Sequence, residues 1–194
     1  LATPTLPAND FKGLVELVRK EGPDKRTSAS PDPGSRLMAE RIFDSGGIKL
    51  MNVPYKGAAS FVLDVSAGRV DIGISSVTSA LSLLQGGKLK ALGIMGTQRV
   101  GIMPDLKTFK EQGFDGLEDN SWYGLFAPAG TPPAVVKAIQ TDIAAALATP
   151  EIQAKIAEMG ALPGGDTPEA FNERFQRDLK ESGEVIKRIG MKAE

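Results

Sequence analysis

Small hydroxyl side chains gather at two places in the sequence where a short apolar segment ends. Ser28 and Ser30 flank Ala29 at the end of one segment, and Ser75 and Ser76 follow another. A serine hydroxyl both donates and accepts hydrogen bonds, and its small side chain lets a ligand approach the backbone. These loops are therefore candidates for binding an anion. The alternative interpretation is plain helix capping, for which serine is a preferred residue.

Tyr55 and Lys56 form a third candidate group, because they directly follow another predicted strand. Lys56 could contribute a point charge to a bound anion, and the alternative is an ordinary surface lysine. The two side chains could in principle act as an acid and a base. No recognisable residue would orient them for that purpose, so a catalytic role is not favoured.

Two residue types that the chain lacks exclude many kinds of site. Its 194 residues include no cysteine and no histidine. Thiol nucleophiles, thiolate metal sites, serine–histidine–aspartate triads and the usual zinc sites are therefore excluded. The net charge of -1 disfavours binding to nucleic acid or to an anionic membrane. Nothing in the sequence calls for a cofactor.

The candidate residues lie between strands and helices that alternate along the first part of the chain. Strands are expected near residues 26–30, 48–53, 70–74 and 89–95, and helices near residues 9–21, 33–46, 58–67, 77–85 and 105–113. Such alternation with short loops of small residues predicts a parallel, doubly wound sheet. Ligands bind such a sheet at the carboxyl ends of its strands, beside the helix N-termini.

The second part of the chain is predicted to be mostly helical. An acidic stretch at 115–120 is expected to be a solvated loop. A metal site is the less favoured alternative, because hard cations need six or more oxygen ligands, which this stretch does not obviously offer. A strand is expected at 121–126. Three Thr-Pro pairs then place a capping threonine before a proline at the first helical position, at Thr131, Thr149 and Thr167. Helices without strands between them must cover a sheet that is supplied elsewhere.

Several motifs of the chain occur together in one family of transport receptors. They are Val53-Pro54-Tyr55-Lys56-Gly57, Gly68-Arg69-Val70-Asp71, Gly87-Lys88-Leu89-Lys90-Ala91-Leu92 and the segment SWYGLFAPAGTP at 121–132. In their order and spacing, the chain resembles the substrate-binding proteins of tripartite tricarboxylate transporters, the TctC or Bug family. The resemblance covers essentially the whole chain.

The resemblance implies an α/β fold of the two-lobed type II periplasmic-binding-protein class. Residues 1–120 would form a complete ligand-binding lobe, and residues 121–194 the mostly helical C-terminal portion of the other lobe. Family members begin with a further segment that this chain is expected to lack, so apolar helix faces would be exposed and chains could self-associate. A hinge is predicted where residues 3–6 and 121–126 cross between the lobes.

The resemblance also implies a periplasmic receptor that is not an enzyme and that delivers a small carboxylate to membrane transporter subunits. Ser28, Ala29 and Ser30 fall on the family's ligand-facing loop. Ser75 and Ser76 stand where the family usually has Asp-Asn, and Arg36 stands where it usually has histidine. An aspartate at 75 would suit an ammonium group, so its absence predicts a ligand without one, such as a dicarboxylate or an aromatic acid.

Two other functions remain open from the sequence. Effector domains of LysR-type transcription regulators share the two-lobed architecture and this approximate length. An enzyme that uses Lys56 or Tyr55 is the remaining alternative. The motifs around Tyr55 and Trp122 favour the receptor over both.

Overall fold

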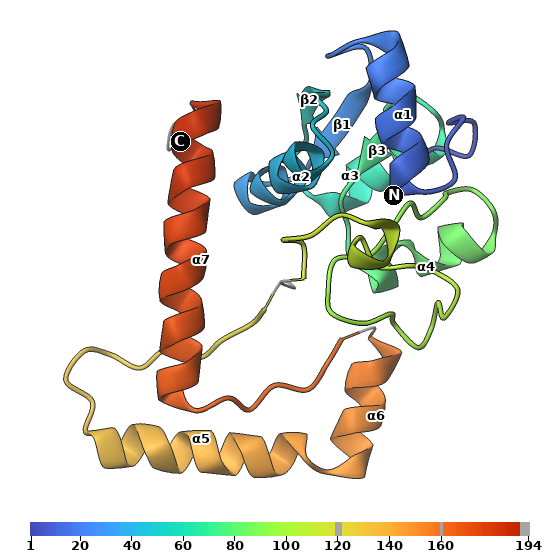
Figure 1. Ribbon diagram of the computed structural model, residues 1–194. Helices are drawn as coiled ribbons and strands as arrows, with labels where there is room; N and C mark the ends of the chain where they lie inside the picture. Colours follow the sequence, from blue (N-terminus) through green and yellow to red (C-terminus); the bar gives the residue numbers. More distant parts are fainter. Residues whose placement is uncertain (119–121, 160, 191–194) are drawn as a thin grey trace. The chain divides into compact units, whose positions relative to one another are not determined.

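The computed structural model describes residues 1–118, 122–159 and 161–190. The chain divides into two compact units, Leu1–Asn120 and Ser121–Glu194. The first unit contains the sheet, and the described part of the second contains three helices (Figure 1).

The first unit is built on a parallel sheet of three strands. The strands are β1 (Thr27–Ser30), β2 (Met51–Pro54) and β3 (Ile72–Gly73), in the order β2-β1-β3. Ala29 of β1 lies opposite Val53 on one side and Gly73 on the other. Helices α1 (Phe11–Glu21), α2 (Pro33–Ser45), α3 (Ala58–Ser66) and α4 (Val77–Gln85) and the 3-10 turn η1 (Lys110–Gln112) complete the unit. The predicted α/β class with a parallel sheet is therefore confirmed.

Two clusters of buried apolar side chains hold the sheet between helices. One cluster joins α1 and α2 to Ile72, and in it the Phe11 ring meets those of Phe109 and Phe114 edge-on at 5.0 and 4.6 Å. The other cluster centres on Phe61 of α3 and includes Ala29. β3 contributes Ile72 to the first cluster and β1 contributes Ala29 to the second. Ile72 lies beside Ser28, and successive strand residues point to opposite faces, so the two clusters lie on opposite faces of the sheet. This is the layered arrangement expected of a doubly wound sheet.

The prediction of a strand at 89–95 is wrong. Within this segment, Lys90 and Ile94 form only isolated bridges, to Ala2 and Thr108. The Leu92 carbonyl instead accepts hydrogen bonds from the Phe11 N–H at 3.0 Å and from Gln112 Nε2 at 3.0 Å. The backbone is thus engaged by the start of α1 and by a side chain, not by a neighbouring strand. The helix expected at 105–113 is likewise reduced to the single turn η1.

The second unit contains α5 (Pro133–Leu147), α6 (Pro150–Glu158) and α7 (Pro168–Ile189). Helices α6 and α7 begin at Thr149 and Thr167 as predicted, whereas Pro132 rather than Thr131 caps α5. The strand expected at 121–126 is absent from residues 122–126, and Ser121 lies outside the described residues, as do two residues of the acidic stretch, 119 and 120.

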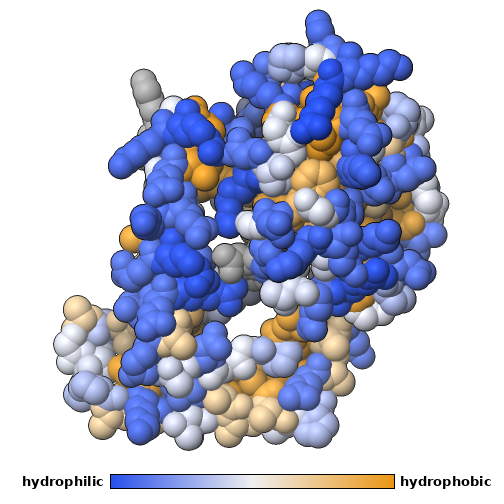
Figure 2. All heavy atoms as spheres, in the orientation of Figure 1, coloured by the Kyte–Doolittle hydropathy of each residue, from blue (hydrophilic) through white to orange (hydrophobic). Residues whose placement is uncertain are grey.

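Trp122, an early residue of the described second unit, is fixed against α7. Its Nε1 donates to Asp178 Oδ2 at 2.5 Å, and its ring meets that of Phe171 edge-on at 5.0 Å. Other apolar side chains of this unit are exposed, namely Leu125, Phe126, Val135, Ile139, Met159, Leu162 and Leu179. Figure 2 shows part of this surface as pale and orange areas over α5 and α6.

Candidate functional site

The carboxyl ends of β1, β2 and β3 lie along one edge of the sheet, which we call the carboxyl edge. Ser30 at the end of β1 lies opposite Pro54 at the end of β2, and β3 ends at Gly73, beside Ala29 (Figure 1). The Tyr55 N–H continues the pairing by donating to the Ser30 carbonyl at 2.9 Å. The fold thus brings together the segments with the predicted site residues, although they come from three separate parts of the sequence.

Three helices begin at the carboxyl edge, and one of them has no side-chain cap. The Asp32 carboxylate caps α2 by accepting the Ser35 N–H at 2.9 Å, and Ser76 caps α4. Helix α3 instead begins at Gly57, whose φ of 95° is a left-handed conformation that favours glycine. The first N–H groups of a helix attract anions, because they lack backbone partners and lie at the positive end of the helix dipole. The start of α3 therefore offers backbone donors to an anion.

The serines of the carboxyl edge fall into two groups. Ser30 Oγ donates to Asn52 Oδ1 at 2.6 Å, and Ser76 Oγ accepts the Ser79 N–H at 3.3 Å, so these two hydroxyls have protein partners. Ser28 Oγ and Ser75 Oγ are shielded from solvent, and no described residue forms a hydrogen bond with either. A buried hydroxyl without a partner is costly, so such groups usually meet a ligand or water. Ser76 behaves as the capping interpretation predicts, whereas Ser75 does not.

Ser28 and Ala29 lie deeper in the strand than the other predicted residues. The Ser28 side chain is 2% exposed, and it points to the same face of the sheet as Ser30. Ala29 is fully buried and packs in the cluster around Phe61. The Ala29 side chain is therefore part of the core, and the edge of this loop that a ligand can reach begins at Ser30.

Tyr55 and Lys56 differ in whether their polar side-chain atoms contact other described residues. The Tyr55 hydroxyl donates to Asp64 Oδ2 at 2.6 Å, and Arg69 forms an ion pair with the same carboxylate. The hydrogen bond to Asp64 raises the pKa of Tyr55, while Arg69 and Tyr55 lower the pKa of Asp64. The Tyr55 hydroxyl proton is thus already hydrogen-bonded to a carboxylate, and this bond links the end of β2 to α3. Lys56 is exposed, and no described residue pairs with its ammonium group.

Arg36 is a further cation near this edge. Its Nε is shielded from solvent and has no hydrogen-bond partner. The sequence pattern contained a signal for it, because Arg36 lies three and seven residues before Ala39 and Phe43, which are both buried on α2. That spacing places an arginine in line with the apolar stripe of the helix.

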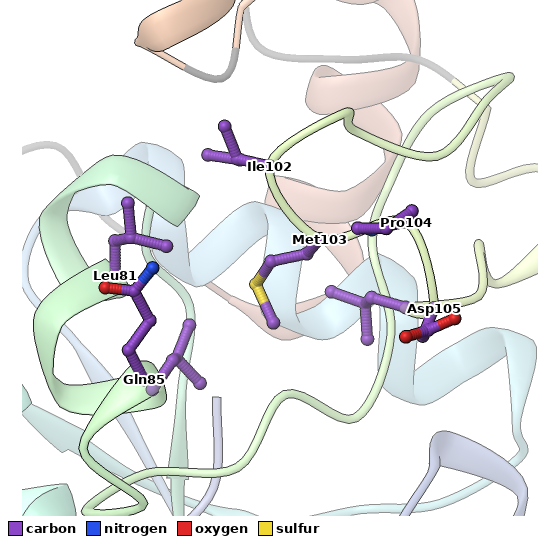
Figure 3. Close-up of a pocket in the computed structure, with 8 residues that line it drawn as sticks. Leu81, Gln85, Ile102, Met103, Pro104 and Asp105 are labelled. Carbon is purple, nitrogen blue, oxygen red and sulfur yellow. The ribbon is translucent and has the colours of Figure 1, made fainter.

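Two surface hollows of the first unit lie away from the predicted residues. One has a volume of about 270 Å³ and lies between α4 and the segment at 102–106, where Leu81 and Gln85 face Met103 across it (Figure 3). The other has a volume of about 430 Å³ and extends from Asn9 to Gln112. Neither is lined by any of the seven predicted site residues. The first is walled largely by apolar side chains, whereas the second also has polar and charged lining residues, among them Asp10, Asp105 and Lys107.

Comparison with known proteins assigns the family. A family model described as tripartite tricarboxylate transporter family receptor matches residues 1–191. The chain belongs to this family. The resemblance predicted from the motifs is therefore confirmed.

Relatives of known sequence and structure agree with this assignment. The UPF0065 protein in the tcbD-tcbE intergenic region of Pseudomonas sp. (strain P51) is 31% identical over 181 residues, which are 91% of this chain and 54% of the relative. A structure described as R. palustris Rpa4515 with adipate is 29% identical, with a TM-score of 0.82 over 97% of this chain and 64% of that one. The periplasmic binding protein BugD is 31% identical, with a TM-score of 0.78 over 100% of this chain and 66% of BugD.

The chain thus has the fold of periplasmic binding proteins, as predicted, and spans about half to two thirds of the length of these relatives.

Proposed function

We propose that this chain is part of an extracytoplasmic receptor that binds a small organic carboxylate at the carboxyl edge and releases it unaltered. The observation that carries the proposal is the convergence at that edge of the unpartnered Ser75 hydroxyl, the uncapped start of α3 and the free Lys56 ammonium group. All three favour an anion. The family and the adipate bound to the R. palustris relative support the same ligand class.

Hydrogen bonds of this kind are strong enough to hold a small ligand. Each hydrogen bond to a carboxylate contributes about 1.5–3 kcal/mol net. Four or five of them supply the roughly 8 kcal/mol of a micromolar complex after the costs of association. The donors proposed for this role are the Ser75 hydroxyl, the first amides of α3 and Lys56.

The ligand is proposed to lack an ammonium group. Two carboxylates near the edge are already engaged, since Asp32 caps α2 and Asp64 binds both Tyr55 and Arg69. Ser75 carries no charge where an aspartate would attract a cation. Calorimetry should therefore detect binding of a dicarboxylate or aromatic acid, and tight binding of aspartate with none of malate would contradict this specificity.

The remaining parts of the proposal concern the whole receptor. Residues 1–120 would be one complete lobe and residues 121–194 part of the other, with a hinge at residues 3–6 and 121–126 and membrane transporter subunits as partners. A periplasmic location is proposed from the family. None of the described helices is both long and apolar enough to cross a bilayer. Self-association through the exposed faces of α5 to α7 stays a prediction.

Neither alternative function is favoured. The family match supports a transport receptor over a LysR-type effector domain. An enzyme that uses Tyr55 would need its hydroxyl proton, which is already hydrogen-bonded to the Asp64 carboxylate.

A thermal-shift panel tests the proposed function. Adipate, malate, citrate and benzoate would each be added at increasing concentration, with dimethyl adipate as the uncharged control. A ligand at 100 times its dissociation constant stabilises the folded protein by about 2.7 kcal/mol. For a domain of this size that corresponds to a rise in melting temperature of roughly 5–10 °C. No shift with any of the acids, or an equal shift with the diester, would contradict the proposal.

A further inference from the structure

We propose that Arg36 binds a carboxylate of the ligand and makes the site selective for dicarboxylates over monocarboxylates. The inference rests on the proposed function and adds to it a specificity-determining residue. It starts from a guanidinium whose Nε is removed from solvent without a hydrogen-bond partner.

The position of Arg36 on α2 directs its side chain to the carboxyl edge. Arg36 continues the stripe of Ala39 and Phe43 that packs on the core, but it lies in the first turns of the helix, close to the end of β1. Side chains of an α-helix lean toward its N-terminus. From the N-terminal end of this apolar stripe, the Arg36 guanidinium therefore extends toward the loop that follows Ser30.

No acidic side chain neutralises this guanidinium. Asp32, one turn earlier, receives hydrogen bonds from the Ser35 N–H at 2.9 Å and from the Ser35 hydroxyl at 2.6 Å. The described residues give the Arg36 side chain no ion pair, whereas Arg26 and Arg99 pair with carboxylates at 2.6 and 2.9 Å. No described side chain therefore balances the charge of this partly buried guanidinium, and a bound anion would do so.

Two positive positions at one edge fit a ligand with two negative ends. A guanidinium holds a carboxylate through two parallel N–H···O bonds. Lys56 and the uncapped start of α3 follow the neighbouring strand, β2, and provide a second place for an anion. A dicarboxylate can occupy both positions, whereas a monocarboxylate leaves one of them empty.

Calorimetry with two acids of equal chain length tests the inference. Adipate and its monocarboxylate counterpart hexanoate would be titrated into the wild-type protein, Arg36→Gln, Arg36→Lys and the control Lys12→Gln, which removes an exposed cation on α1. Loss of the charge-assisted hydrogen bonds should weaken adipate binding by roughly ten- to a hundredfold in Arg36→Gln. Hexanoate binding should change little, Arg36→Lys should recover part of the adipate affinity, and Lys12→Gln should match the wild type.

A measurement without ligand separates a binding role from a structural one. Because no described residue pairs with the Arg36 side chain, Arg36→Gln should unfold at the same temperature as the wild type or higher. A lower unfolding temperature in both Arg36 variants would show that the residue is structural and would overturn the inference. Equal adipate affinity in the wild type and Arg36→Gln would overturn it while leaving the proposed function intact. A wild-type protein that binds neither acid would contradict the proposed function as well.

Discussion

Replacing Gly73 with alanine tests how α3 is seated on the sheet. Gly73 is the last residue of β3, and the ring of Phe61 in α3 lies directly against it. A Cβ at position 73 would lie 2.6 Å from Phe61 Cε2 and 2.8 Å from Cδ2. Phe61 is fully buried, so its ring cannot rotate away into solvent. The added methyl group must therefore push α3 away from the sheet or distort the end of β3.

The expected cost follows from this overlap. Overpacking a buried site usually costs about 1–3 kcal/mol, and two ring atoms inside contact distance place Gly73→Ala well within that range. At about 2 kcal/mol the melting temperature should fall by roughly 4–8 °C. Carboxylate affinity should fall too, because α3 positions its first N–H groups at the carboxyl edge. Thermal and urea unfolding followed by circular dichroism measure the first effect, and calorimetry measures the second.

Gly101→Ala is the matched control, because a Cβ at position 101 meets no atom within 4 Å. It should change the free energy of unfolding by less than about 0.5 kcal/mol. Phe61→Leu replaces the ring with a smaller side chain and leaves more room for a Cβ at position 73. This substitution should therefore lower the free energy of unfolding less in Gly73→Ala than in the wild type. Equal stability of Gly73→Ala and Gly101→Ala would show that Phe61 accommodates the added methyl group and would contradict this prediction.

Three further changes probe other parts of the chain. Arg99 and the Thr108 N–H lower the pKa of Glu111 from 4.5 to about 2, so the stability from this group is complete above pH 4.5 and is lost as the pH falls toward 2. In Glu111→Gln, the free energy of unfolding measured by urea titration should fall less between pH 4.5 and 2 than in the wild type. An unchanged pH dependence would contradict this. Gly183→Ala, within α7 and with open space around it, should stabilise that helix by about 0.5–1 kcal/mol as followed by Trp122 fluorescence, and a loss of stability would contradict this. Ser75→Ala should weaken carboxylate binding roughly tenfold without loss of stability, since it removes an unpartnered hydroxyl, and unchanged affinity would exclude Ser75 from the site.

Local chemistry made most elements of the fold predictable. The start of α2 follows from Asp32 and Pro33, which are favoured at the N-cap and the first helical position, and Thr149 and Thr167 mark α6 and α7 in the same way. The strand expected at 89–95 failed because its hydrogen bonds depend on distant partners. Gln112, which donates to the Leu92 carbonyl, also accepts the Phe11 N–H from 101 residues away. Apolar alternation does not reveal such a partner.

The sequence predicted that the candidate residues gather at one edge of the sheet, but not which protein groups their side chains contact. Parallel strands followed by helices bring the serine loops and Lys56 to one edge. Whether a given hydroxyl is free depends on its neighbours, so Ser76 and Ser75 could not be told apart by residue type. Tyr55 stays a predicted site residue, but the sequence did not reveal that its hydroxyl donates to Asp64, nine residues further along the chain.

An NMR titration locates the binding site most directly. Adipate would be added to the ¹⁵N-labelled protein while amide shifts and the signals of adipate itself are followed. We predict saturable shifts at Ser30, Gly57 and Ser75, with adipate recovered chemically unchanged. Shifts confined to residues around the hollow between α4 and Met103, or conversion of the adipate into a product, would contradict a receptor that binds carboxylates at the carboxyl edge.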